Sequence, residues 1–252
     1  MSFLNPTTWP LFAKKPRTEV AKPYYPYIMI DGETAGTGPT SALFSIGAVA
    51  YNPMTGEVDI DNAFCSNIDL QSCIDAGLTI DGEAIYWWLE RSTEARAGIC
   101  EATTTTEIDE NGTRRQHTKR YSLLEVLTDF SDWMAPYNAE YCRINKPRHE
   151  GVASAMAWSN GADFDLPILA NAYRAIGHAK PWAAFQGRCY RTDKSAGWGI
   201  KMERTGTHHN ALDDAISQAQ HHIDIVNELR SARRALAQQR LQTPVIKEVA
   251  KS

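Results

Sequence analysis

Several features that are common in other protein classes are missing from this sequence. Its 252 residues contain five cysteines, an odd number, and none forms a C-x-x-C pair, which argues against a disulfide framework and a zinc site of that spacing. No apolar run reaches the roughly 18 residues that a membrane-spanning helix needs, and the proline-rich N-terminus has no apolar signal core. These absences predict a cytoplasmic protein with reduced thiols and no contact with a membrane.

Positive charge is also in short supply. Lys and Arg number 26 against 30 Asp and Glu, a net charge of −4, which excludes a polybasic coat for nucleic acid but not an enzyme that acts on nucleic acid at one local site. The charge is unevenly spread, because residues 1–26 carry +3, residues 27–228 carry −12 and residues 229–252 carry +5. The surplus carboxylates of the middle are either solvated surface or ligands for a hard cation.

The periodicity of the apolar residues, which make up 43% of the chain, predicts one α/β domain at residues 27–228. The expected strands lie at residues 27–31, 41–51, 58–68, 154–158 and 189–192. The expected helices start near Asp81, span residues 122–137 and 166–176, and start near Ala211 to run toward Arg240. Three consecutive strands followed by strands that alternate with helices are typical of a mixed sheet flanked by helices.

Three segments fall outside this pattern. Residues 1–26 are predicted to form a proline-rich arm. Residues 101–120 are a polar insertion, either a loop or an exposed hairpin around an Asn-Gly turn. Residues 229–252 form the basic end of the last helix and a tail, which either guide a nucleic acid backbone or form a solvated surface.

Two carboxylates lie where the first buried strand ends. Asp31 and Glu33 are two residues apart, so they share one face of the strand and lie side by side. Like charges this close raise the pKa of each group, and a divalent cation between them removes that cost. A solvated strand end is the alternative. The next candidates, Asp163 and Asp165, follow the strand at 154–158, where ligands of α/β sheets collect, although either could instead cap the following helix.

A histidine and an aspartate lie near the start of the longest helix. Asn210 fits its N-cap position, and Asp213 three residues later resembles a capping box, so Asp214 is the better candidate for chemistry. His209 converges with Asp214 only if it lies in the loop before the helix. A histidine beside a metal site suits a general base near neutral pH, and a structural loop residue is the alternative.

Taken in chain order, the patterns D-x-E, N-x(3)-F-D and H-x(4)-D resemble the motifs of the DEDDh 3′–5′ exonucleases, within the ribonuclease H-like superfamily. The resemblance implies a ribonuclease H-like mixed five-stranded sheet flanked by helices. The catalytic residues that it implies are Asp31, Glu33, Asp165, His209 and Asp214, whereas Asp163 departs from the register. Residues 69–77, 86–89 and 188–192 further resemble a subgroup from phages, prophages and bacteria, which implies a phage or bacterial origin.

The resemblance also implies phosphodiester hydrolysis with two divalent metal ions, Mg²⁺ or Mn²⁺, because oxygen-only ligands favour these ions over zinc. The metal ligands that it implies are Asp31, Glu33, Asp165 and Asp214. His209 would take the proton from the attacking water. The implied substrate contacts are Thr34, Ala35, Gly36, Asn160, Phe164 and Trp87. Trp87 is either a platform for base stacking or a residue of a helix core.

The expected substrate is the 3′ end of single-stranded nucleic acid, with DNA slightly favoured and nucleoside monophosphates released. An exoribonuclease is the closest alternative, because one or two contacts to the 2′-OH decide between the sugars. An endonuclease of the same superfamily and a catalytically inactive nucleic-acid-binding protein on the same fold are the others. The oligomeric state stays open, and a homodimer through the apolar face of the long helix is one alternative.

Overall fold

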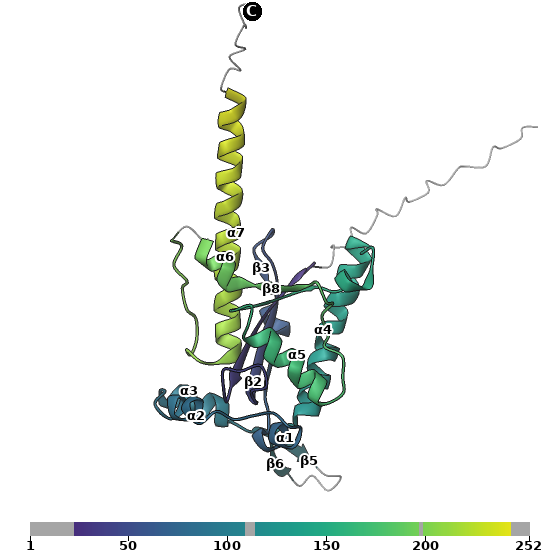
Figure 1. The fold of residues 1–252 in the computed structure, drawn as a ribbon, viewed down its shortest axis with the longest axis vertical. Coiled ribbons are helices and arrows are strands. Elements are labelled where there is room, and N and C mark those ends of the chain that lie inside the picture. Colours follow the sequence, from purple (N-terminus) through teal and green to yellow (C-terminus); the bar gives the residue numbers. More distant parts are fainter. Residues whose placement is uncertain (1–22, 109–113, 197–198, 243–252) are drawn as a thin grey trace, which may run out of the picture.

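The structure, a computed structural model, is organised around a mixed β-sheet (Figure 1). It describes residues 23–108, 114–196 and 199–242, so most of the arm expected at residues 1–26 and the end of the tail lie outside the described residues. Six strands form the sheet: β1 (Tyr27–Thr34), β2 (Leu43–Asn52), β3 (Glu57–Val58), β4 (Phe64–Asn67), β7 (Met156–Ser159) and β8 (Gly187–Cys189). The order is β3-β2-β1-β7-β8, and β4 also pairs with β2. The mixed α/β class is therefore confirmed.

The directions of the strands separate the sheet into two parts. β1 is antiparallel to β2, which is antiparallel to β3 and β4. β7 runs parallel to β1, and β8 runs parallel to β7. The carboxyl ends of β1 and β7 consequently meet at one edge of the sheet, where an α/β protein collects its ligands.

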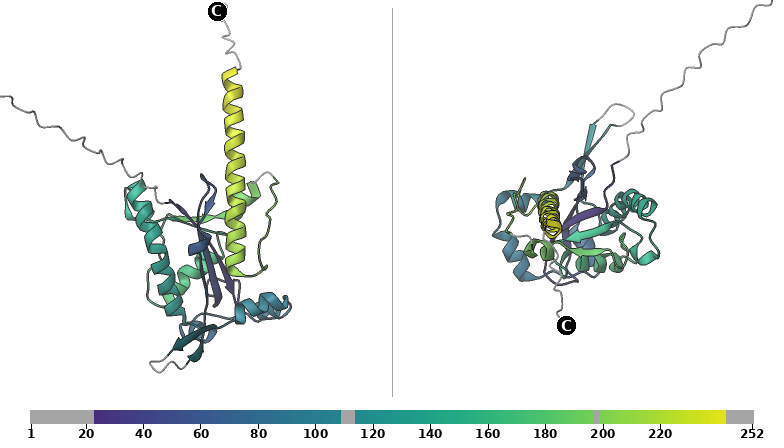
Figure 2. Two further views of the ribbon diagram at one scale, coloured as in Figure 1. Left: turned by 180° about the vertical axis from the view of Figure 1, so that it is seen from behind. Right: turned by 90° about the horizontal axis from the view of Figure 1, so that it is seen from above.

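Helices cover both faces of this sheet (Figure 2). The α-helices are α1 (Leu70–Asp75), α2 (Gly82–Leu89), α3 (Thr93–Cys100), α4 (Leu123–Asn145), α5 (Asp165–Ala175), α6 (Tyr190–Ala196) and α7 (Ala211–Gln242). The insertion forms a separate hairpin of β5 (Thr103–Ile108) and β6 (Arg114–Lys119), so the hairpin alternative is the correct one. Among the described residues no helix is long and apolar enough to cross a membrane.

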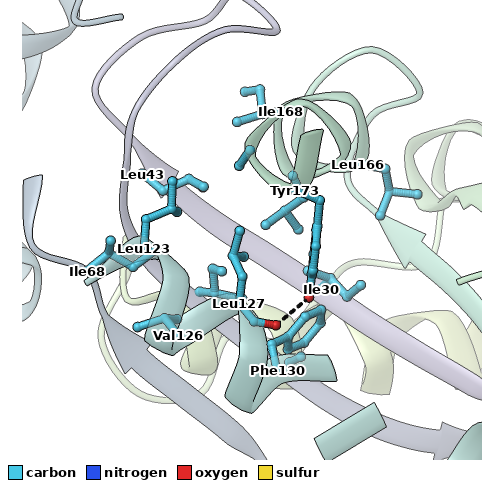
Figure 3. Close-up of a cluster of buried hydrophobic side chains, with 14 of the residues drawn as sticks. Ile30, Leu43, Ile68, Leu123, Val126, Leu127, Phe130, Leu166, Ile168 and Tyr173 are labelled. Carbon is cyan, nitrogen blue, oxygen red and sulfur yellow. Dashed lines mark hydrogen bonds between the residues drawn. The ribbon is translucent and has the colours of Figure 1, made fainter. Parts of the chain in front are cut away.

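The face of the sheet under α4 and α5 is apolar. Ile28 and Ile30 of β1 belong to a large buried cluster with Leu127 and Phe130 of α4, and Figure 3 shows part of it. The hydroxyl of Tyr173 on α5 donates to the Leu127 carbonyl at 2.8 Å, the bond dashed in Figure 3. The two helices therefore stabilise each other as well as the sheet.

The opposite face of the sheet lies under the first half of α7. Met29 and Val49 pack there with Ala215 and Ala219 in a second buried cluster. The apolar face of α7 is thus used inside the molecule, and the dimer contact that the sequence suggested through this face is not available.

The start of α7 approaches strand β2 without an intervening side chain. A Cβ placed on Gly47 would lie 2.2 Å from the backbone of Ala211 and Leu212, so only glycine fits this position. Gly47 is also the cross-strand partner of Asp31. The glycine therefore sets the first turn of α7 directly over the acidic end of β1.

Some sequence expectations about the sheet and helices need correction. The single strand expected at 58–68 is split by a 3-10 turn (Ile60–Asn62), and both parts pair with β2, which gives six strands rather than five. The strand expected at 189–192 ends at Cys189, because Tyr190 turns inward and its hydroxyl hydrogen-bonds to His221 Nδ1 of α7 at 2.5 Å.

Three helices also differ from expectation. The helix expected at 122–137 starts from a capping box of Ser122 and Glu125 and continues past Pro136 to Asn145. Buried Tyr141, which accepts a hydrogen bond from Gln186, holds its last turns against the body. The short helices α1 and α3 were not expected, because six to eight residues are too few to establish a helical period.

Candidate active site

Three carboxylates from β1 and α7 form the centre of the site. Asp31, Glu33 and Asp214 each offer an oxygen that lies within 4.8 Å of the others. Asp31 and Glu33 are on the same face of β1, as expected of residues i and i+2, and Asp214 reaches them from the first turn of α7. Glu33 and Asp214 are buried, while Asp31 keeps some exposure to the pocket described below.

A fourth carboxylate, Asp165, borders this cluster from the start of α5. Its Oδ1 accepts a hydrogen bond from the backbone N–H of Gly32, between the two acidic residues of β1, at 3.2 Å. Asp165 is 3% exposed, whereas Asp163 is an exposed residue. Neither aspartate caps α5, because its N-cap is Phe164 without a side-chain hydrogen bond. The capping alternative is therefore wrong for both.

Burial and mutual repulsion shape the electrostatics of these groups. Burial raises the pKa of Glu33 to about 8, with Asp214 and Asp165 adding to the shift. Burial also raises the pKa of Asp165 to about 7, against the backbone hydrogen bond from Gly32, which lowers it. The pKa of Asp31 rises well above its usual value through burial and the charges of Asp165 and Glu33. A bound cation would reverse all three shifts.

The unused hydrogen-bonding capacity of the cluster fits a cation. Within the described chain, Glu33 Oε1, Asp165 Oδ2 and Gln218 Oε1 are buried acceptors without a hydrogen-bond partner. Such groups are costly to bury unless something pairs with them. Every atom in this set is an oxygen, which suits a hard divalent cation rather than zinc or copper.

Two further side chains hold the carboxylates in place. Gln218, one helical turn after Asp214, donates from Nε2 to Asp31 Oδ1 at 2.7 Å, and the guanidinium of Arg204 forms an ion pair with Asp214. Sequence reasoning did not find either residue. The spacing of four residues between Asp214 and Gln218 was a usable signal, because it places both on one face of the helix.

His209 lies in the loop before α7 and converges with Asp214. Its backbone is left-handed, with φ of 64°, and its N–H donates to Asp214 Oδ2 at 3.1 Å. The imidazole stacks on His208 and meets the edge of Trp87, with ring centroids 3.7 and 4.9 Å apart. Burial and then the neighbouring His208 lower the pKa of His209, which keeps the ring neutral near pH 7.

The N-terminal cap of α7 differs from the expectation in one respect. Asn210 Oδ1 accepts from the N–H groups of Leu212 and Asp213, at 3.1 and 3.2 Å, as an N-cap residue does. The Asp213 carboxylate does not complete a capping box and instead accepts from the Thr207 N–H at 2.6 Å. This bond ties the loop that carries His209 to the helix that carries Asp214.

A pocket of about 530 Å³ opens over the carboxylates and His209. Of the expected substrate contacts, it is lined by Thr34, Gly36, Asn160, Phe164 and Trp87. Ala35 does not line it, because its side chain is fully buried and its backbone bonds to Ala42 and Asp81.

Trp87 is 40% exposed and is therefore a pocket wall rather than a core residue. Its neighbour Trp88 takes the core position, with 4% exposure, and donates to the Thr34 carbonyl at 2.9 Å. The guanidinium of Arg91 lies 4.2 Å from the centre of the Trp87 ring, which holds the indole in place at the pocket rim.

One side of the pocket is basic. Arg191 and Lys194 of α6 and Arg204 of the following loop line it, and Arg191 donates to the Asn160 carbonyl at 2.7 Å. Sequence reasoning missed these residues, since three cations spread over fourteen positions form no local pattern. Side chains of this kind hold the phosphate groups of a nucleic acid.

Residues 26–226 match the family model described as the 3′–5′ exoribonuclease Rv2179c-like domain. The chain belongs to this family. This Rv2179c-like domain is therefore a 3′–5′ exonuclease with a nucleic acid substrate, and the pocket with its acidic floor and basic side is the candidate for its active site.

Two further proteins are similar to this Rv2179c-like domain. The exodeoxyribonuclease of Enterobacteria phage T4 is 26% identical over 153 residues, which cover 59% of this chain and 56% of that protein. The match thus spans about half the length of that relative. The crystal structure of cell-death related nuclease 4 (CRN-4) is similar over 80% of this chain and 64% of that chain, with 11% identity and a TM-score of 0.40.

Proposed function

We propose that this Rv2179c-like domain is a metal-dependent exonuclease of the DEDDh type, which removes nucleoside monophosphates from the 3′ end of a single strand. The proposed ligands for two divalent cations, Mg²⁺ or Mn²⁺, are Asp31, Glu33, Asp165 and Asp214. The observation that supports this proposal best is the meeting of four acidic side chains from three elements around buried acceptor oxygens that lack partners.

The residues around the carboxylates divide the work of hydrolysis. Bound divalent cations supply a Lewis acid at the scissile phosphate and make water acidic enough to attack near neutral pH. His209, neutral because of its lowered pKa, accepts the proton of that water at a ring nitrogen. Arg191 and Lys194 bind the phosphate groups on the basic side of the pocket.

The terminal nucleotide is held by the opposite side of the pocket. Trp87 provides an exposed indole for the terminal base, and stacking of this kind contributes about 1–3 kcal/mol per base. Thr34 and Gly36 border the same space at the end of β1. Asn160 and Phe164 enclose it from the loop before α5, where the second acidic motif begins.

The sugar of the substrate is the part of the proposal that the comparisons change. The sequence slightly favoured DNA, whereas the matching family is described as exoribonucleases over residues 26–226. RNA therefore becomes the first candidate. DNA is the second, supported by the similarity to the phage T4 exodeoxyribonuclease.

A parallel digestion assay tests the function and the sugar together. RNA and DNA strands of one sequence, labelled at the 5′ end, are incubated with the protein in Mg²⁺, in Mn²⁺ or in EDTA. We expect a ladder that shortens from the 3′ end in either metal, faster on RNA, and no digestion in EDTA. Internal cuts from the start of the reaction, or full activity in EDTA, would overturn the proposal.

The assignment of His209 needs a separate measurement. The variant His209→Ala is compared with His208→Ala, its stacked neighbour, across pH 6–9. We expect the first variant to lose activity and the acidic limb of the pH–rate profile, and the second to keep both. A rate for His209→Ala that matches the parent at every pH would remove this residue as the base, even if the metal site stands.

A further inference from the structure

The last part of α7 projects from the body of the protein. Figures 1 and 2 show the helix continuing past the rest of the described chain. Side chains 211–226 of α7 are mostly buried or partly buried, whereas all those of residues 231–240 are exposed. The family match ends at residue 226. We call the projecting segment, residues 229–240, the arm.

The arm carries its positive charges on one side. The four arginines of the arm are Arg230, Arg233, Arg234 and Arg240. At 100° per residue they fall within an arc of about 120°. The segment contains no acidic residue, and the nearest one, Glu228, lies about 160° around the helix from Arg230. The arm therefore presents an uncompensated basic face.

This basic face does not contribute to folding. Arginines three and four residues apart repel each other and weaken a helix. Arg230 donates to the Met54 carbonyl at 3.2 Å, but within the part of the chain that the structure describes Arg233, Arg234 and Arg240 form no hydrogen bond or ion pair. Their concentration on one side therefore points to a negatively charged partner.

We propose that the arm binds the phosphate backbone of the substrate strand upstream of the 3′ end, an inference that rests on the proposed function. The helix itself connects the two sites, because Asp214 of the acidic cluster lies in its first turn. With a rise of 1.5 Å per residue, Arg230 and Arg240 lie about 24 and 39 Å along the axis from Asp214. At about 3.4 Å per stacked nucleotide, this spacing corresponds to about 7 to 11 nucleotides.

Helix α6 provides the connection between the pocket and the arm. It packs beside α7, where Asp193 Oδ2 hydrogen-bonds to His222 Nε2 at 3.0 Å. From that position α6 contributes Arg191 and Lys194 to the basic side of the pocket. A strand that leaves the active site over α6 therefore continues in the direction of the arm.

A second copy of this chain fits the arm less well. The apolar residues Leu229 and Leu236 are one heptad apart, but a coiled coil needs such a seam over three or four heptads. A second arm would also bring more arginines against the first. Nucleic acid complements this charge, so the arm is assigned to the substrate rather than to self-association.

Binding measured by fluorescence anisotropy tests the inference without catalysis. The protein is held in EDTA and titrated against single strands of about 20 and about 4 nucleotides at several salt concentrations. The test variant is R233Q/R234Q/R240Q, and R233K/R234K/R240K is the matched control that keeps the charge. Circular dichroism checks that both keep the helix, as their propensities predict.

We expect the glutamine variant to bind the long strand at least about 10-fold more weakly at low salt, with a salt slope smaller by about 2 because three phosphate contacts are lost. The lysine variant keeps the slope, and neither variant changes binding of the short strand. Unchanged long-strand binding of the glutamine variant, or equal losses on both lengths, would overturn the inference. A change in mass by sedimentation equilibrium for the glutamine variant, with unchanged strand binding, would likewise overturn it and assign the arm to self-association.

Turnover separates this result from the proposed function. In Mg²⁺ the glutamine variant should show a lower kcat/KM on long strands only, with the same kcat. If the parent digests neither RNA nor DNA but binds long strands through the arm, the exonuclease proposal fails and the arm site stands.

Discussion

The two faces of strand β1 use one backbone for opposite purposes. The face with Ile30 meets α4 in a cluster that includes fully buried Phe130. The face with Asp31 and Glu33 meets α7, which brings Asp214 to within 4.8 Å of both. One residue along the strand is enough to pass from one environment to the other, because side chains alternate.

The difference shows where the protein gains stability and where it gives some up. Burial of apolar side chains under α4 contributes roughly 25 cal/mol per Å². Burial on the α7 face raises the pKa of the carboxylates of Asp31, Glu33 and Asp165 and so opposes folding while they are charged. The apolar face therefore stabilises a fold that the acidic face weakens, and the two can be tested separately.

Removing one charge from the acidic face should have the largest effect. We expect Asp31→Asn to lower the rate constant for hydrolysis by at least about 10³-fold, because a shared cation clamp is lost. Its free energy of unfolding in EDTA should stay the same or rise, because one of the repelling carboxylates is gone. Single-turnover kinetics and urea unfolding measure the two quantities. A nearly normal rate in Mg²⁺ would contradict the assignment.

An equally severe change on the apolar face should have the reverse signature. Phe130→Ala removes a fully buried ring that stacks near Trp133 and meets Phe64 edge-on. We expect a loss of about 3–5 kcal/mol in the free energy of unfolding, with kcat per folded molecule unchanged. Leu124→Ala, at a half-exposed position of the same helix, is the control and should cost far less. A large fall in kcat for folded Phe130→Ala would mean that the faces are not independent.

Gln218 allows a milder disturbance of the acidic face. Gln218→Leu keeps the shape but removes the hydrogen bond to Asp31. We expect Mn²⁺ affinity and kcat to fall about 10- to 100-fold, as for other residues that orient a metal ligand, with little change in unfolding. Gln220→Leu, at an exposed position of α7, should leave both unchanged. Equal Mn²⁺ affinity for the two variants, measured by calorimetry, would reduce Gln218 to a packing residue.

The pH dependence of stability should show the smallest effect. The pKa values of Glu33 and Asp165, about 8 and about 7, lie above their ordinary values of 4.5 and 3.8, so without metal the folded state binds more protons than the unfolded state. Its free energy of unfolding should therefore fall as pH rises from about 5 to 8. Mn²⁺ at 100 times its Kd should restore up to about 2.7 kcal/mol at the upper end. Urea unfolding in EDTA that becomes harder with rising pH would refute this account.

Much of this contrast between faces can be predicted from the sequence, because strand alternation is local. Asp31 and Glu33 fall on one face by counting, and His209 was expected in the loop before the last helix, where it lies. Gln218 and Arg204 could not be found in this way. A glutamine in a long helix has no local mark of its partner, and the contact of Arg204 with Asp214 depends on the path of a loop.

The boundaries that the sequence misplaced have a common physical reason. Tyr190 favours a strand by its own propensity, but its burial beside His221 begins α6 instead. Tyr141 similarly extends α4 beyond the point where its apolar period fades. In both cases a contact with a distant part of the chain decides where an element ends.

Gly47 gives the carboxylate cluster a dependence on a residue that has no functional group. Any larger residue there would lift the first turn of α7 from β2 and move Asp214 away from Asp31 and Glu33, while every acidic side chain remained in the chain. A genetic screen for inactive variants should therefore recover Gly47 together with the acidic residues. Drift at this position is closed for as long as the activity is under selection.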